Sequence, residues 1–230
     1  MKVLKENWKE IKREYEEFAA SEVHPWPEKN LFERVDPKSK ERKEGEGWNV
    51  FGLYAFNKKH AKNCEKCPVT AKIVESLPYK VSTAAFSLLT PHSHIVPHTG
   101  YVGYSDRVFR CHLGLIVPEK KKRSEKRTFD PQPFDVENPV YENCRLRVAN
   151  KWWDWEEGEL LVFDDTHTHE AWNYTDVTRV ILLLDFERPE EFLPNKVKLE
   201  IKISNANKDP FKTGNRGDIY LDSLTSKHGY

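Results

Sequence analysis

The chain has 230 residues, of which 38% are hydrophobic, with seven Trp, nine Tyr and twelve Phe. These aromatic residues can fill a core even though the mean hydropathy is only -0.77, so the composition excludes a disordered chain. Thirty-seven Lys and Arg residues balance thirty-seven Asp and Glu residues, which leaves no net charge that would attract nucleic acid or an anionic membrane.

The length suits one folded domain, expected over residues 1–205, followed by a polar C-terminal tail over 206–230. The first residues lack the apolar segment of a signal peptide, and no run approaches the ~20 apolar residues that cross a membrane. We therefore expect a cytoplasmic protein with no membrane span and no nucleic-acid partner. Its four cysteines are too sparse for a disulfide framework and are expected to be reduced.

Residues 1–80 are expected to supply the helices of the domain. Apolar residues recur every three or four positions among Lys and Glu, which predicts an amphipathic helix over 2–20. A charged connection over 28–47 shows no periodicity and leads into a strand-like run, GWNVFGLYAF. After Pro68, the segment VTAKIVESL predicts a second short helix.

From residue 81 onward, short β-type runs replace the helical patterns. They are VSTAAFSLL, HIVPH, VFRCHLGLIV, CRLRVA, ELLVF and RVILLLDF. Turn residues separate these runs and the helices precede them, which favours an antiparallel barrel or sandwich over alternating βαβ units. We therefore expect a β-barrel core over 81–190 and, from the alternating pattern of NKVKLEIKIS, one additional strand within 191–205.

Two of these runs carry charged side chains at positions that predict a cavity. Successive residues of a strand point to opposite faces, so Arg110 and His112 share one face while the apolar residues of the run take the other. Arg179 opens RVILLLDF, a run too apolar for a surface. Its guanidinium must therefore meet an anion or the rim of a cavity.

Carboxylates and histidines cluster in FDDTHTHEAWN, residues 163–173, where a strand-like run ends. Imidazole binds divalent iron, zinc, copper or nickel, and two histidines with a carboxylate describe the open iron site of non-haem oxygenases. Such a polar segment is also typical of a solvated turn, so partners elsewhere in the chain must decide between these interpretations.

Residues 119–143 interrupt the β pattern with a basic run, EKKKRSEKR, and a Pro-rich stretch. A solvated surface loop is the simplest interpretation, and docking to an acidic partner is the alternative. The polar tail after residue 205 either covers the mouth of a site or is loose.

Four strings, SLLTPHSHIVPHTG, RCHLGLIVP, CRLRVANKWWDWEEGELLVFDDTHTHEAWN and RVILLLDFERP, resemble the aspartyl/asparaginyl β-hydroxylase family over residues 48–190. The resemblance implies a double-stranded β-helix, that is, a mainly β, cupin-like jelly roll with flanking helices. It also implies a dioxygenase that uses iron(II), 2-oxoglutarate and O2 to hydroxylate an unactivated C–H bond.

The resemblance assigns the metal site to four positions. His98 and His169 correspond to the two iron ligands of the family. Gly100 stands where other oxygenases have a carboxylate ligand, and Asp165 corresponds to an aspartate thought to act through a metal-bound water.

The resemblance also implies a cosubstrate site. Ser87 and Arg179 correspond to the groups that bind the distal carboxylate of 2-oxoglutarate, and Arg110 and His112 to those at the end that chelates iron. Arginine suits such a site because its charge is permanent and its donors can bind a carboxylate in pairs.

The sequence departs from the family pattern where the substrate binds. Peptide hydroxylases of the family have an arginine two positions before the one that corresponds to Arg110, whereas this chain has Val108. The neighbouring Arg107 is therefore the candidate substrate contact. The expected target is the β-carbon of an aspartyl or asparaginyl residue, or of a related amino acid, in a small molecule or peptide. A lipid acyl chain as substrate, or a non-catalytic cupin-like binding module, are the alternatives.

Overall fold

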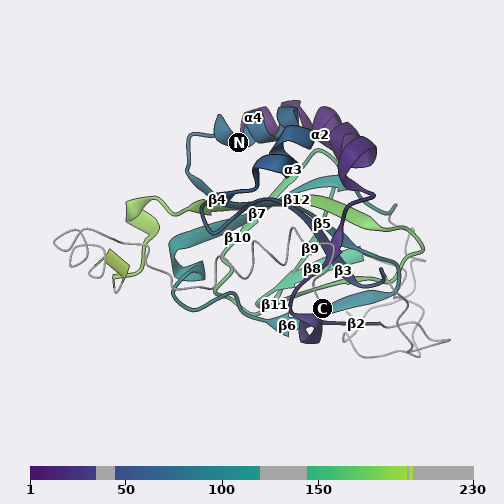
Figure 1. Ribbon diagram of the computed structural model, residues 1–230. Coiled ribbons are helices and arrows are strands. Elements are labelled where there is room, and N and C mark those ends of the chain that lie inside the picture. Colours follow the sequence, from purple (N-terminus) through teal and green to yellow (C-terminus); the bar gives the residue numbers. More distant parts are fainter. Residues whose placement is uncertain (35–44, 120–143, 196, 199–230) are drawn as a thin grey trace.

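The structure is a computed structural model, and it describes residues 1–34, 45–119, 144–195, 197 and 198. Within these residues the strands form two sheets that face each other, and the helices cover the outer side of the larger sheet (Figure 1). The predicted mainly β fold with flanking helices, a double-stranded β-helix, is therefore confirmed.

The larger sheet has the order β1-β3-β5-β12-β7-β10, and β4 pairs with β3. Its strands are β1 (His24–Pro25), β3 (Trp48–Ala55), β4 (Lys58–Lys59), β5 (Val81–Leu89), β7 (Val108–Ile116), β10 (Leu160–Phe163) and β12 (Arg179–Glu187). The apolar run RVILLLDF is central because β12 pairs with β5 on one side and β7 on the other. Strand β3 belongs to this sheet and covers the strand-like run GWNVFGLYAF that was predicted between the helical segments.

The smaller sheet has the order β2-β6-β11-β8-β9. Its strands are β2 (Phe32–Arg34), β6 (Ser93–His98), β8 (Cys144–Val148), β9 (Lys151–Asp154) and β11 (His169–Asn173). The sequence pattern did not predict β11, whose five residues are all buried. The polar residues of β11 are typical of an exposed turn, but here the strand is buried because the Glu170 carboxylate is paired with His94 and Arg147.

The helices match the sequence prediction closely. They are α1 (Lys2–Glu6), α2 (Trp8–Glu14), the π-helix η1 (Tyr15–Ala19), η2 (Lys29–Leu31), α3 (Ala61–Lys66), α4 (Pro68–Glu75), η3 (Ser105–Arg107) and η5 (Glu190–Phe192). The first three cover the predicted helix over 2–20, and α4 covers most of the second predicted helix. Ile11 and Ile73 of the helices join Phe86, Leu113 and Leu182 of the sheet in one core.

A buried carboxylate joins two of these helices. Glu14 of α2 accepts hydrogen bonds from the backbone N–H groups of Val69 (2.8 Å) and Thr70 (2.7 Å) and from the Thr70 hydroxyl (2.6 Å). The first N–H groups of a helix have no partner within it and carry its positive end. Glu14 therefore caps α4 from a distant part of the chain.

Replacing Glu14 with alanine should lower the free energy of unfolding by about 2–3 kcal/mol, because it leaves buried donors without an acceptor. The matched control is Glu10→Ala, which removes an exposed ion pair with Arg13 and should cost at most ~0.5 kcal/mol. Denaturant unfolding of both variants measures the difference. Equal losses would show that the cap contributes nothing beyond an ordinary surface charge.

The C-terminal segment differs from the prediction. Lys198 donates its backbone N–H to the Pro194 carbonyl at 3.0 Å, and residues 195, 197 and 198 are helical, so the predicted strand is wrong at its start. The rest of that strand, the tail 206–230 and the loop 120–143 lie outside the described residues. No helix in the described ranges could cross a bilayer. The four cysteines are free and buried, as predicted.

Candidate active site

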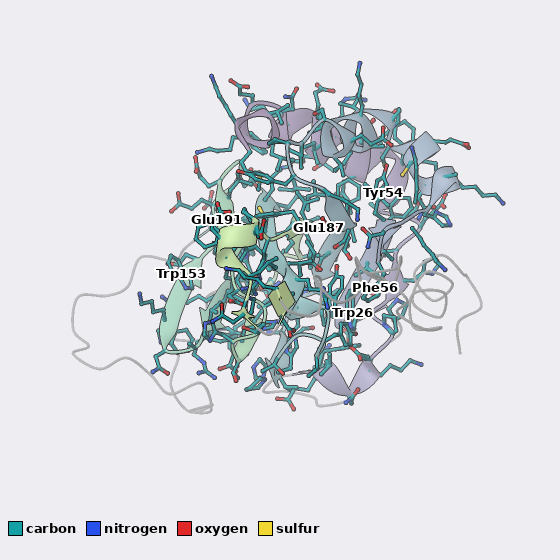
Figure 2. The ribbon with its side chains drawn as sticks, turned by 90° about the vertical axis from the view of Figure 1, so that its left-hand side faces the viewer. Trp26, Tyr54, Phe56, Trp153, Glu187 and Glu191 are labelled. Atoms are coloured by element: carbon teal, nitrogen blue, oxygen red, sulfur yellow. The ribbon has the colours of Figure 1, made fainter. Side chains whose placement is uncertain are left out.

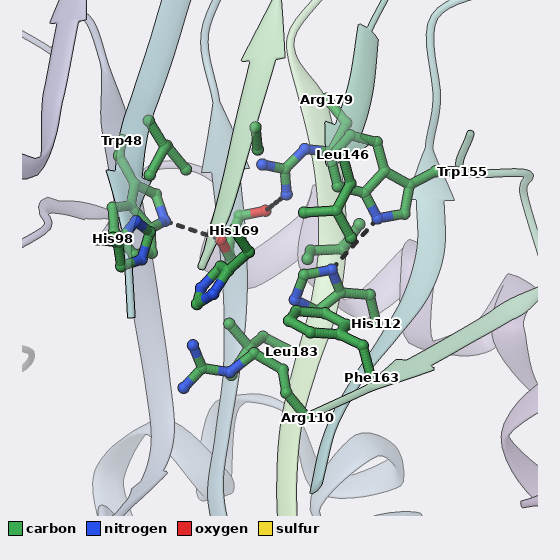
Figure 3. A pocket seen from close by; sticks show the side chains of 14 residues that line it. Trp48, His98, Arg110, His112, Leu146, Trp155, Phe163, His169, Arg179 and Leu183 are labelled. Atoms are coloured by element: carbon green, nitrogen blue, oxygen red, sulfur yellow. Dashed lines mark hydrogen bonds between the residues drawn. The ribbon is translucent and has the colours of Figure 1, made fainter. Parts of the chain in front are cut away.

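A pocket lies between the two sheets (Figure 3). Six of the eight residues predicted for the site line it, and they come from both sheets. They are Ser87, His98, Arg110, His112, His169 and Arg179. The alternation of β7 is confirmed, because Arg110 and His112 face this cavity while Cys111 and Leu113 lie in the core on the other side.

The two predicted metal ligands are neighbours on paired strands. His98 of β6 is in register with His169 of β11, and the ring centroids are 4.2 Å apart. Each Nδ1 lies 2.8 Å from a backbone carbonyl two residues earlier, that of Val96 or His167. A carbonyl can only accept, so each Nδ1 carries the proton and each Nε2 keeps its lone pair. Burial lowers the pKa of His98, and that of His169 to about 4, which keeps both imidazoles neutral.

Asp165 is the carboxylate nearest to this pair, although it does not line the cavity wall. Its Oδ1 lies 3.3 Å from His169 Nε2 and 2.6 Å from Arg110 Nη1, and its Oδ2 accepts from the Ser105 hydroxyl at 2.8 Å. A Cβ at Gly100 would come within 1.9 Å of Asp165 Oδ2. Glycine at position 100 is thus what allows the Asp165 carboxylate to stand beside the histidines.

This donor set fits a metal that keeps several coordination positions open. Two bare imidazole nitrogens suit divalent iron, and a structural zinc site would need four protein ligands. Among the described residues, no group of three or more His, Cys, Asp or Glu forms a complete metal-binding cluster. Any metal held by His98 and His169 would therefore take its remaining ligands from water or a bound molecule.

Arg110 faces the cavity but is already paired. Its Nε and Nη2 donate to the two carboxylate oxygens of Asp185, at 2.8 and 2.9 Å, and its Nη1 contacts Asp165. Asp185 is buried, which raises its pKa, and the Arg110 charge opposes this shift. Asp185 was not among the predicted site residues. Its position in the sequence could have indicated it, because Asp185 follows Arg179 by six residues in an apolar strand, so that both side chains point to the same face.

Arg179, in contrast, is a buried cation without an anionic partner among the described residues. Arg179 is 1% exposed, and its Nη1 makes a long contact of 3.4 Å with the Ser87 carbonyl. Its Nε has no hydrogen-bond partner within the part of the chain that the structure describes. Burial lowers its pKa to about 10, so it stays charged at neutral pH. The Ser87 hydroxyl accepts from the Trp48 indole at 2.9 Å and keeps its own proton to donate. Together these groups can bind one carboxylate.

Arg107 lies apart from the other predicted residues. It ends the short helix η3, its Nε donates back to the Gly103 carbonyl at 3.3 Å, and it does not line the cavity. Val108 beside it is buried.

A second cavity adjoins the first and shares Ser87, Arg110 and Leu183 with it. Its walls are mostly apolar and include Trp26, Val50, Ala55, Phe56 and Ala85. Figure 2 shows Trp26 and Phe56 close together, on the opposite side of the view from Trp153. The Tyr104 hydroxyl at its wall contacts Ser82, Thr83 and Asp185, so the polar groups there are already satisfied.

Comparison with known proteins gives a consistent result. The sequence model of a family described as aspartyl/asparaginyl beta-hydroxylase matches residues 5–189. The chain is 38% identical over 143 residues to the ornithine lipid ester-linked acyl 2-hydroxylase of Rhizobium tropici, covering 62% of this chain and 42% of that protein. It is 28% identical over 194 residues to the human aspartyl/asparaginyl beta-hydroxylase, covering 83% and 21%.

The chain therefore spans less than half the length of these two relatives. Among solved structures, a Pseudomonas putida prolyl-4-hydroxylase is similar with a TM-score of 0.43 and 15% identity, covering 82% of this chain and 87% of that chain.

Proposed function

Since the chain belongs to the aspartyl/asparaginyl β-hydroxylase family, we propose that it is an iron(II)- and 2-oxoglutarate-dependent dioxygenase that hydroxylates an unactivated C–H bond. The observation that supports this most is the cavity itself, in which two bare histidine nitrogens lie near a buried arginine that has no anionic partner among the described residues. A binding module without catalysis has no physical need for both features.

Each residue then has a defined task. His98 and His169 would hold iron(II) through Nε2, and Asp165 would orient the molecule bound at the neighbouring coordination position. Arg179 and the Ser87 hydroxyl would bind the far carboxylate of 2-oxoglutarate, with His112 and Arg110 toward its other end. When bound, iron and 2-oxoglutarate supply the oxidation, in which decarboxylation of the oxoacid to succinate is coupled to hydroxylation by O2. The chain's own contribution is to position these groups and exclude water.

Succinate formation tests this function. We expect the purified protein to convert 2-oxoglutarate to succinate slowly in the presence of iron(II) and O2, and faster with a true substrate. Omission of iron(II) should stop the reaction. A protein that binds neither iron(II) nor 2-oxoglutarate would be a cupin-like binding module instead.

Two classes of substrate are candidates, an aspartyl or asparaginyl side chain and an acyl chain, and the structure is relevant to both. An aspartyl or asparaginyl side chain would need a donor, but Arg110 is neutralised by Asp165 and Asp185, and Val108 replaces the arginine of the peptide hydroxylases. The apolar second cavity favours an uncharged chain such as an acyl group. The similarity to an acyl 2-hydroxylase points the same way.

Filling the second cavity should discriminate between the candidates. Ala85 faces this cavity, so Ala85→Leu should lower kcat/KM for an acylated substrate at least ~10-fold while substrate-free succinate formation persists. Arg107→Ala is the control and should leave both rates within about twofold, because Arg107 lines neither cavity. Products are scored by a 16-dalton mass gain. Strong turnover of an aspartyl peptide that depends on Arg107 would instead support the peptide substrate.

A further inference from the structure

We propose that Trp155 is a positioning residue whose indole sets the tautomer of His112 and the plane of Arg179, so that both aim N–H donors at one dicarboxylate. The inference rests on the proposed function, because the dicarboxylate is 2-oxoglutarate. Trp155 follows β9 directly and is 3% exposed, and its ring lies against both side chains (Figure 3).

The indole N–H fixes where the His112 proton lies. Trp155 Nε1 is 3.2 Å from His112 Nδ1, and an indole nitrogen can only donate. His112 Nδ1 must therefore accept, which leaves the single proton of a neutral imidazole on Nε2. Burial, together with the nearby charges of Arg179 and Arg110, holds the pKa of His112 well below its usual value. The buried Nε2–H has no hydrogen-bond partner in the described ranges, so it is a donor available to a ligand.

The indole face holds the second donor. The Arg179 guanidinium carbon lies 4.6 Å from the centroid of the Trp155 ring, at a distance typical of a cation–π contact. A guanidinium that is buried without an anion needs such a contact to keep one orientation. Because the Arg179 Nε also lacks a partner among the residues that the structure describes, the same indole supports two donors, both from residues that line one cavity, that are available to a ligand.

The backbone is shaped to bring Trp155 to this place. The segment after Trp155 crosses β7 at Gly114, where a Cβ would come within 2.2 Å of the Glu156 carbonyl oxygen. The Gly158 N–H donates to the Gly114 carbonyl at 2.9 Å, and the Gly114 N–H donates to the Glu159 carbonyl at 3.1 Å. Only glycine at position 114 permits this crossing. Gly114 of β7, the strand that also carries His112, therefore helps to determine the position of the indole.

The tautomer can be observed without metal or cosubstrate. Protein labelled with 15N-histidine should show His112 as a single Nε2–H tautomer in long-range 1H–15N spectra, with the signal assigned by its loss in His112→Asn. Trp155→Phe keeps an aromatic ring but removes the N–H donor, so we expect His112 to become a mixture of its two tautomers. Trp152→Phe is the control, because Trp152 packs against Trp172 and Arg145 instead, and it should leave the His112 signal unchanged.

Binding supplies the second readout, with 2-oxoglutarate titrated in the presence of manganese(II). We expect about 10-fold weaker binding in Trp155→Phe and about 100-fold in Trp155→Leu, which also removes the face under Arg179. If Trp155→Leu does not fold, Trp155→Phe alone decides.

Two results would overturn the proposal. One is a His112 that remains a single Nε2–H tautomer in Trp155→Phe, whatever happens to affinity, since Trp155 would then only pack. The other is a shifted tautomer with unchanged binding. Failure of the native protein to bind 2-oxoglutarate would count against the proposed function, which the tautomer measurement does not require.

Discussion

Replacing Arg179 with alanine should weaken 2-oxoglutarate binding by about 2–4 kcal/mol, which is on the order of 30- to 1000-fold. The reason is its environment: the guanidinium is 1% exposed and has no anionic partner among the described residues. A carboxylate bound there is removed from water, and without the arginine it would be a buried charge without compensation. Equilibrium titration under anaerobic conditions, with iron(II) present, measures the loss.

Two further variants sharpen this result. Arg179→Lys should recover only part of the affinity, because an ammonium cannot make the paired contacts of a guanidinium or stack on Trp155 in the same way. Arg145→Ala removes an arginine that also packs on a tryptophan, but outside the cavity, and should leave binding unchanged. Native-like affinity in Arg179→Ala would refute the assignment of this arginine to the cosubstrate.

Local rules predicted part of this site, namely Arg110, His112 and Arg179, whereas the roles of the other site residues came from the family resemblance. Side chains alternate along a strand, so the pairing of Arg110 with His112 on one face followed from their spacing alone. The apolar run after Arg179 likewise required a buried cation. Both rules act within one strand and need no knowledge of its neighbours.

What the sequence did not reveal depends on contacts between distant segments. Asp185 meets Arg110 only because β12 and β7 pair in that register. Strand β11 looked like part of a polar turn because His94 and Arg147, which satisfy Glu170, come from two other strands. The sequence around Trp155 likewise gives no sign that its indole lies between His112 and Arg179.

The role of Gly100 shows how the two kinds of information combine. The resemblance marked a glycine where a ligand carboxylate would be expected, but it gave no physical reason. In the structure the Asp165 carboxylate fills the space that a side chain at position 100 would need, and the Gly100 N–H donates to the Asp165 carbonyl at 2.8 Å. The proposed metal site would therefore have two histidines from paired strands, with the carboxylate of a loop residue beside them.

Removing either histidine should therefore affect iron(II) more than removing the carboxylate does. We expect His98→Ala and His169→Ala to lose more than ~100-fold in iron(II) affinity, and Asp165→Ala to lose about 10- to 100-fold, the range typical of groups that orient a ligand. The physical basis is that each histidine presents a bare Nε2, whereas the Asp165 carboxylate is already held by Ser105 and Arg110. Anaerobic titration with iron(II) gives the three affinities.

A fourth histidine variant makes this comparison specific. His94 is buried and lies on β6, the strand that also carries His98, but its two ring nitrogens contact Glu170 at 2.8 Å and Glu33 at 3.1 Å, so it has none free for a metal. His94→Ala should keep iron(II) affinity within about 10-fold of native, and any loss should come with lower thermal stability. If Asp165→Ala abolishes binding as completely as the His98 and His169 variants do, the 3.3 Å between Asp165 Oδ1 and His169 Nε2 marks two ligands of one metal, and the site is a facial triad.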